Sequence, residues 1–165
     1  MTPRAVASRT PALSLAVQYA VAAATLPTRA QVRRWVCSAL GTDARVTVRF
    51  VGTREGRMLN GLYRGKDYAT NVLTFVYDDV VPLTGDVVLC APVLRREAKT
   101  LGKPLTAHCA HLVVHGMLHL QGYAHDTDRA ARTMEAHETS VLEGLGVPDP
   151  YARQPAAAPG ARRRA

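Results

Sequence analysis

The sequence predicts one domain that combines four β-strands with five α-helices. With 165 residues, 47% of them hydrophobic, the chain is long enough for one sizeable core and too short for two. Four short segments have the composition or the alternation of strands, and five longer segments carry helix-start and helix-stop signals. Together these observations indicate a single domain with loose ends.

The first predicted strand covers residues 13–20. Apolar side chains at positions 13, 15, 17 and 19 alternate with serine, alanine and glutamine, which is the period of a half-buried strand. Arg4 and Arg9, followed by an apolar run that ends at Ala24, also resemble the start of a secretory signal peptide. Because Gln18 interrupts that run, we favour the strand. No stretch is apolar for long enough to span a membrane.

The other elements follow in order along the chain. Thr28 is a candidate N-cap for a helix that runs to Leu40 and ends at Gly41. Pro104 opens a helix that is rich in histidine, and Asp126 or Thr127 is the candidate cap of the last helix. The remaining predicted elements are strands at 45–51, 71–77 and 85–90 and helices at 53–63, 92–100 and 128–145.

The net charge of +8 lies mostly at the two ends of the chain. Residues 1–10 and 151–165 contain six arginines and no acidic residue, so residues 11–150 carry only +2. Charge in tails is weak support for RNA binding. We expect a flexible N-terminus over residues 1–10, a folded domain over 11–147 and a disordered tail rich in arginine, alanine and proline over 148–165.

The three cysteines predict a reducing compartment. Cys37, Cys90 and Cys109 are odd in number, lie far apart in the sequence and form no C-x-x-C pair. We therefore expect three buried free thiols, as in a protein of the cytoplasm.

The strongest signal in the chain is a group of three histidines. His115 and His119 are four residues apart, so on a helix they lie on one face about 6 Å apart along the axis. His125 comes six residues later and reaches the same ion only if the helix stops and the chain turns back. Gly122 accepts the left-handed conformation that such a turn requires. Three neutral imidazoles suit zinc or another borderline divalent metal.

A fourth ligand from the same helix is disfavoured, so the predicted site keeps one open coordination position. Cys109 lies about 120° around the helix from His115. His111 and His108 share the histidine stripe, but they precede His115 by one and two helical turns, about 6 to 10 Å along the axis. Three ligands and an open position are typical of a catalytic metal. The opposite side of the helix is apolar and is predicted to be buried: Ala110, Val113, Met117 and Leu120.

The chemistry of such a metal depends on its neighbours. The same histidine spacing occurs in zinc peptidases, which place a glutamate directly after the first histidine as general base. Here that position is Gly116, so proteolysis is disfavoured unless another carboxylate substitutes. The polar segment 59–71 is either a simple connection with Gly65 as a helix C-cap, or it supplies Arg64 to hold a phosphate beside the metal.

Segments 59–75 and 115–125, together with Gly85 and Asp86 at the fourth strand, resemble the bacterial YbeY family over about residues 11–147. Members of that family are zinc-dependent endoribonucleases of ribosomal RNA maturation. The resemblance implies a single α+β domain with a small mixed four-stranded sheet, flanked by helices. It implies one Zn²⁺ ion at the end of a central helix, and the ligands that it implies are His115, His119 and His125. Arg64 matches the arginine that the family needs for activity.

The resemblance also implies a substrate and a place in the cell. The substrate is single-stranded ribosomal RNA, and the roles are maturation of the 3′ end of small-subunit rRNA and ribosome quality control in the cytoplasm, in contact with the ribosome or its small-subunit precursor. Two positions depart from the family pattern. Ala124 stands where the family usually has aspartate, and Ala69 where it often has proline. Losing that aspartate would weaken metal affinity by about an order of magnitude, unless the neighbouring Asp126 substitutes for it.

The working hypothesis is that the zinc activates a water or orients a ribose hydroxyl while Arg64 neutralises charge on the phosphate. Two alternatives remain at this point. A zinc metallopeptidase would use the same ion, and the glycine at position 116 argues against it. A non-catalytic ribosome biogenesis factor would use the zinc only to fold, so that chelation would unfold it.

Overall fold

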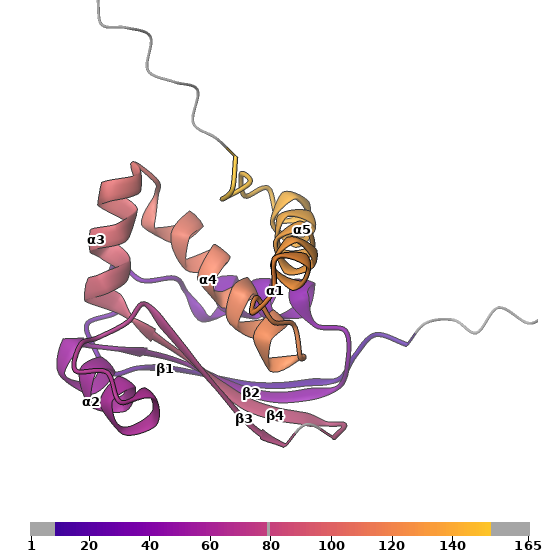
Figure 1. Ribbon diagram of the computed structural model, residues 1–165, viewed down its shortest axis with the longest axis horizontal. Coiled ribbons are helices and arrows are strands. Elements are labelled where there is room, and N and C mark those ends of the chain that lie inside the picture. The colour runs from indigo at the N-terminus through magenta and orange to yellow at the C-terminus, as the bar shows by residue number, and fades with distance from the viewer. Residues whose placement is uncertain (1–8, 79, 153–165) are drawn as a thin grey trace, which may run out of the picture.

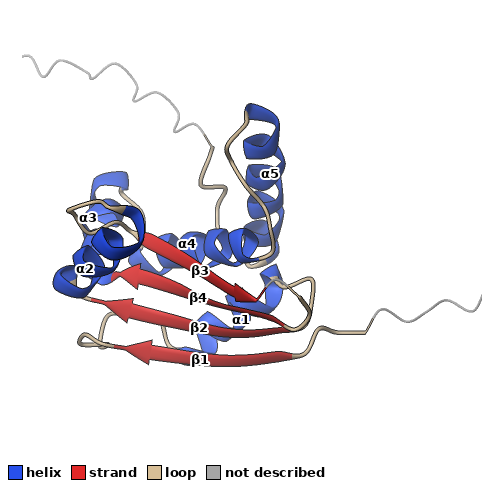
Figure 2. Ribbon diagram, turned by 60° about the horizontal axis from the view of Figure 1, so that its bottom comes forward, coloured by secondary structure: helices blue, strands red, loops and turns tan. Residues whose placement is uncertain are grey.

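Four strands form one mixed sheet in the computed structural model, which describes residues 9–78 and 80–152 (Figure 1). The order across the sheet is β1-β2-β4-β3, as Figure 2 shows. β1 (Leu13–Tyr19), β2 (Ala44–Val51) and β4 (Leu83–Cys90) are parallel neighbours, and β3 (Val72–Asp78) pairs antiparallel with β4 at the sheet edge. The predicted mixed four-stranded sheet is confirmed, and so is the strand that was preferred to a signal peptide.

Helices cover both faces of the sheet unequally (Figure 1). α1 (Arg29–Ala39), α4 (Leu105–Leu120) and α5 (Asp128–Gly144) lie on one side, α2 (Thr53–Arg64) lies on the other, and α3 (Ala91–Leu101) follows β4 directly. The main core therefore forms between the sheet and α1, α4 and α5. It includes, among others, Val32, Val36, Val46, Val48, Phe50, Val87, Leu89, Val113, Met117 and Leu142.

β4 is a central strand with both faces buried. Val87 and Leu89 belong to the main core, whereas Val88 and Cys90 face a smaller cluster beneath α2. A strand that is covered on both sides is apolar at successive positions instead of alternating. This explains why residues 87–90 are apolar without a break.

Two helix starts follow the predicted capping chemistry. Thr28 and Gln31 form a capping box, in which the Thr28 hydroxyl accepts from the Gln31 backbone N–H and the Gln31 side chain accepts from the Thr28 N–H. At α5 the cap is Thr127, whose hydroxyl accepts from the backbone N–H of Ala130. Of the two predicted candidates, Thr127 and not Asp126 is therefore the N-cap of α5.

α4 packs closely on the sheet because glycines remove side chains at two contacts. A Cβ at Gly116 would lie only 2.8 Å from Cγ1 of Val87, and a Cβ at Gly85 would lie 2.8 Å from Cδ2 of Leu120. This close approach fixes the rotation of α4 about its axis. The apolar side of the helix faces the core, and the histidine stripe is left at its partly exposed side.

The two ends of the described chain are held by polar contacts. The Arg9 guanidinium pairs with Asp43 at 2.5 Å, and the Asp43 carboxylate also accepts from the backbone N–H of Ala12 at 2.8 Å. Residues 148–152, which were expected to belong to a disordered tail, are described, and Tyr151 donates a hydrogen bond to Glu138. The expectations for residues 1–8 and 153–165 lie outside the described residues.

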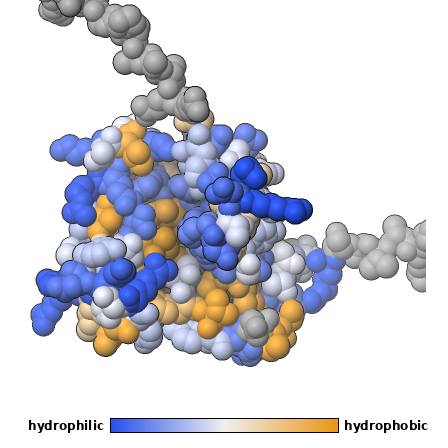
Figure 3. Space-filling view, viewed as in Figure 1, coloured by the Kyte–Doolittle hydropathy of each residue, from blue (hydrophilic) through white to orange (hydrophobic). Residues whose placement is uncertain are grey.

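Cys90 and Cys109 are buried free thiols as expected, but Cys37 is exposed on α1. The expectation of three buried thiols was therefore wrong for Cys37, because its position on α1 faces away from the core that holds Val36. Apolar side chains are also exposed at the end of β3 and in the turn that follows it, namely Val76, Val80 and Val81, and Figure 3 shows apolar surface in this part of the molecule. Among the described residues, no helix is both long and apolar enough to cross a bilayer.

Candidate metal centre

The three predicted histidines lie together. His115 and His119 come from α4, and His125 comes from the segment that connects α4 to α5. One ligand atom from each ring lies within 4.8 Å of the other two. The ring centroids of His115 and His119 are 4.5 Å apart, and that of His125 is 4.8 Å from His119. The three-histidine group expected from the spacing is therefore present.

Gly122 produces the turn that brings His125 back. Its φ of 96° lies in the region that side chains rarely adopt. The Gly122 N–H donates to the carbonyl of His119, and the Tyr123 N–H donates to that of Leu118. Gln121 ties the same turn to the end of α1, because its side-chain amide donates to the Ala39 carbonyl and its oxygen accepts from the Gly41 N–H.

Hydrogen bonds fix the tautomers of the two helical imidazoles. Nδ1 of His115 contacts the Glu138 carboxylate, and Nδ1 of His119 lies 2.9 Å from the Tyr123 carbonyl oxygen. Both partners only accept, so each Nδ1 carries the proton and each Nε2 is left with a lone pair. The two Nε2 atoms face each other at 3.0 Å. Facing lone pairs repel unless a cation lies between them, so this arrangement fits a metal ion held by two neutral imidazoles.

Glu138 is the functional residue that the sequence analysis missed. Its side chain is fully buried on α5, where its carboxylate accepts from His111, His115 and Tyr151. Burial would raise the pKa of Glu138, but these three hydrogen bonds outweigh it and lower the pKa to about 2. A signal was present, since Met134, Glu138 and Leu142 follow one another at four-residue intervals on the buried side of α5.

The same carboxylate belongs to a second group of possible ligands, formed by His111, His115 and Glu138. Its oxygens are already used as hydrogen-bond acceptors from the two rings. The group is therefore best explained as the support that orients His115.

The environment of His119 favours its neutral form. Burial lowers the pKa of His119, and the positive charge that His115 and His125 can carry lowers it further. A neutral imidazole is the form that binds a metal. The electrostatics of the site thus favour the ligand state of this ring.

The other two histidines of α4 also contact carboxylates: His111 shares Glu138 with His115, and His108 has the separate partner Glu97. Nε2 of His108 lies 2.7 Å from Glu97, whose carboxylate also accepts from the Asn71 side chain. The three-histidine group gains no hydrogen bond from Asp126 in the part of the chain that the structure describes. Glu138, and not Asp126, is the carboxylate that meets a ligand ring.

Arg64 belongs to a different helix from His115 and His119. It ends α2, on the opposite side of the sheet from α4 (Figure 1), and Gly65 caps the helix with a φ of 66°. The neighbouring Tyr63 packs edge-on against Phe75 of β3, at 4.8 Å between ring centroids. Within residues 9–78 and 80–152, no hydrogen bond or ion pair involves the Arg64 side chain, so its guanidinium is free for a ligand and is not held against the histidine group.

Comparison with known proteins identifies close relatives. The family model described as endoribonuclease YbeY matches residues 20–146. A protein of Aromatoleum aromaticum named endoribonuclease YbeY is 60% identical over 143 residues, which cover 85% of this chain and 93% of the relative. A protein of the same name from Nitrosomonas eutropha is 54% identical and covers 85% of this chain and 99% of its own length.

A solved structure shares the fold. The solution structure of TM1509 from Thermotoga maritima aligns with a TM-score of 0.53 and covers 85% of this chain and all of its own. Its sequence identity is 23%, so the likeness concerns the arrangement of helices and strands alone.

Proposed function

This chain belongs to the YbeY family of endoribonucleases, and on that premise we propose that it cuts single-stranded RNA with a metal ion held by His115, His119 and His125. The observation that supports this most directly is the pair of Nε2 atoms that face each other at 3.0 Å while both Nδ1 atoms are occupied. Two Nε2 lone pairs at this distance can bind one divalent cation together, as the imidazole ligands of a zinc ion do.

The donor set supports zinc in particular. Three neutral imidazoles are typical of zinc and other borderline divalent metals, whereas magnesium and calcium prefer oxygen ligands. When bound, a divalent ion at this position would supply Lewis acidity to a phosphodiester oxygen. The chain's own contribution is to hold the rings: Glu138 orients His115, and the Tyr123 carbonyl orients His119.

Two separate cavities border the histidine group and support an internal cut. One cavity of about 270 Å³ is lined by His115, His125, Glu138 and Tyr151. Another of about 490 Å³ lies beside His119 and is lined by Val76 and Tyr123, among others. A strand that occupied both cavities would have nucleotides beside more than one of the three histidines, which suits an endonuclease.

We propose that Arg64 binds a phosphate of the RNA. Its side chain is exposed and makes no hydrogen bond or ion pair in the described structure, and a guanidinium can hold two phosphate oxygens at once. Because Arg64 ends α2, which lies on the other side of the sheet from α4 (Figure 1), it fits a phosphate on a strand that passes around edge strand β3. In this role Arg64 neutralises charge on the substrate.

The proposed substrate is the precursor of small-subunit ribosomal RNA, cut near its 3′ end in the cytoplasm, with a role in ribosome quality control. Family membership supports this part of the proposal. It predicts that the protein associates with the small ribosomal subunit or its precursor.

The peptidase alternative is disfavoured by packing. Peptidases with this histidine spacing place a glutamate where this chain has Gly116. A Cβ at that position would meet Val87 at 2.8 Å and Thr74 at 3.3 Å, so the position faces the sheet and has no room for a general base. A casein digestion assay with the zinc-loaded protein should therefore show no cleavage.

Cleavage of single-stranded RNA tests the proposal. The variants His119→Ala and Arg64→Ala should each cut at least about a hundredfold more slowly than the parent protein. Arg54→Ala is the matched control, because Arg54 is another exposed arginine of α2. Equal rates in the parent protein, His119→Ala and Arg64→Ala would discard the proposal.

A further inference from the structure

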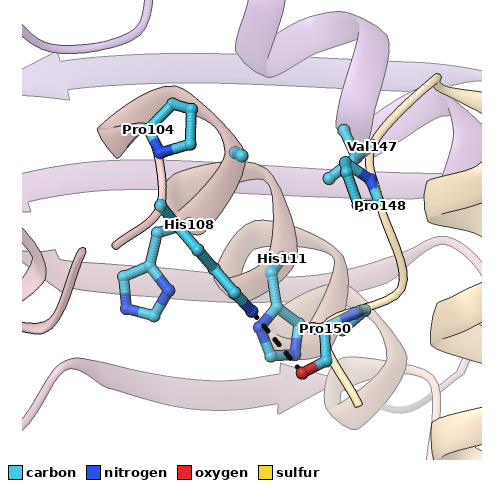
Figure 4. Close-up of a pocket in the computed structure, with 8 residues that line it drawn as sticks. Pro104, His108, His111, Val147, Pro148 and Pro150 are labelled. Carbon is cyan, nitrogen blue, oxygen red and sulfur yellow. Dashed lines mark hydrogen bonds between the residues drawn. The ribbon is translucent and has the colours of Figure 1, made fainter. Parts of the chain in front are cut away.

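A small cavity lies beside the histidine stripe of α4. The two stripe residues that line it, His108 and His111, precede His115 by about two turns and one turn of the helix. The cavity is enclosed between the first half of α4 and the chain that follows α5 (Figure 4). Its volume is about 130 Å³, and its walls are mostly apolar, formed by Pro104, Ala107, Val147, Pro148 and Pro150. A cavity of this size and polarity suits one flat ring of about the size of benzene.

One buried polar atom in this cavity has no partner. His108 is only 5% exposed, and its Nδ1 is buried without a hydrogen bond to any described residue. Its Nε2 meets the Glu97 carboxylate, which only accepts, so Nε2 carries the proton and Nδ1 is left as an acceptor. In Figure 4 one nitrogen edge of the His108 ring faces the inside of the cavity. A ligand with an N–H group would satisfy this atom.

A positively charged side chain also lines the cavity. Lys103 lines it, and its ammonium makes a long contact of 3.5 Å with the Pro150 carbonyl. Among the described residues Lys103 forms no ion pair, so its charge is available to an anionic ligand. A flat apolar slot, a hydrogen-bond acceptor and an unpaired ammonium together suit a nucleotide, which has a heteroaromatic ring with N–H groups and a phosphate.

His111 connects this cavity to the metal centre. It lines the cavity, and its ring lies 6.2 Å from that of His115 and 5.6 Å from that of Tyr151. The cavity therefore lies about one helical turn from a proposed metal ligand. One nucleotide of an extended strand can span such a separation.

From this geometry we propose that the cavity holds a nucleobase of the RNA, next to the nucleotide whose phosphodiester is cut. The inference rests on the proposed endoribonuclease function and adds a substrate subsite to it. The base enters between Ala107 and the proline rings of 148 and 150, and one of its N–H groups donates to Nδ1 of His108. All four bases combine a flat six-membered ring with such an N–H, so the subsite can hold that ring of any of them, while the second ring of a purine stays at its opening.

Binding of adenosine 5′-monophosphate to the zinc-loaded full chain tests this subsite. Ring signals of ¹⁵N-labelled histidines are recorded by NMR during the titration, with ribose 5-phosphate as the probe that lacks a base. We expect AMP to shift the His108 signals in a saturable manner and ribose 5-phosphate to leave them in place. Ala107→Leu fills the cavity and should weaken AMP binding at least about tenfold.

Ala136→Leu is the matched control, because Ala136 is an exposed alanine of helix α5. Thermal unfolding of both variants verifies that they are folded. Unchanged His108 signals with AMP, equal AMP affinity in Ala107→Leu, or equal shifts with ribose 5-phosphate would each overturn the nucleobase subsite. If the parent protein cuts RNA in these cases, the proposed function stands without the subsite. Saturable AMP binding in a protein that cuts no RNA would instead contradict the proposed function.

Discussion

Glu138 of α5 accepts a hydrogen bond from Nδ1 of His115 of α4, so the last helix orients an imidazole of the three-histidine group. The carboxylate is fully buried and is shared with His111 and Tyr151. Buried carboxylates behind a ligand imidazole fix its tautomer and raise its basicity. α5 therefore contributes directly to the proposed metal centre through Glu138.

Replacing that carboxylate should weaken metal binding. Glu138→Gln keeps the size of the side chain but removes its charge, and we expect about 10- to 100-fold lower zinc affinity. Competition with a chromophoric chelator measures the zinc affinity of each variant. Glu143→Gln, an exposed position of the same helix, should match the parent protein. Equal zinc affinity in Glu138→Gln and the parent would show that Glu138 does not support the ligand.

Removing the metal should abolish RNA cleavage and leave the fold in place. The main core joins the sheet to α1, α4 and α5 through apolar contacts that need no ion. We therefore expect unchanged far-UV circular dichroism in EDTA, a lower melting temperature because a ligand of the native state is lost, and recovery of cleavage when zinc is added. Unfolding in EDTA would instead favour a factor that uses zinc only to fold.

Adding one methyl group at Gly116 should destabilise the protein. The new Cβ would lie 2.8 Å from Val87 in a packed interface, and such overpacking costs about 1–3 kcal/mol. Gly144→Ala is the control, because a Cβ there meets nothing within 4 Å, and it should stabilise α5 by up to about 1 kcal/mol. Urea denaturation measures both. Equal stability changes in the two variants would refute the packing explanation for Gly116.

Asp43 should make stability depend on acid pH. Hydrogen bonds from the Ala12 backbone N–H and the Arg9 guanidinium lower the pKa of Asp43 below its ordinary value of 3.8. A carboxylate with a lowered folded pKa stabilises the protein above the unfolded value, and this contribution is lost as the pH falls through the folded pKa. Asp43→Asn should therefore be less stable than the parent at about pH 6 and should approach it at about pH 3. A difference in urea midpoint that stays constant over this range would contradict the assignment.

The local sequence specified most of the fold. Capping at Thr28, alternation in β1 and the glycine after α4 each depend on residues within a few positions, and each was confirmed. The turn at Gly122 was sufficient to predict that His125 returns to His115 and His119. The exposure of Cys37 was not predicted, because it depends on how α1 is rotated against the core.

Contacts between distant segments were harder to predict. Glu138 lies 23 residues from His115, and its place in the site depends on how α5 crosses α4. The buried stripe of α5 includes the carboxylate of Glu138. A buried carboxylate requires a polar partner in the core, but the sequence does not show which residue that partner is. Arg64 was expected beside the metal, but helix α2 lies on the other side of the sheet, so the role of this residue stays a proposal.

The contact of Tyr151 with Glu138 and His111 places residues 151 and 152, the last described residues, beside the histidine group. Whatever follows residue 152 starts at the rim of the histidine group. A polyhistidine affinity tag after residue 165 would be joined to this rim by only the 13 residues 153–165, so its local concentration would let it compete for a metal ion bound there. Metal content and affinity should therefore be measured on protein whose purification handle has been cleaved off.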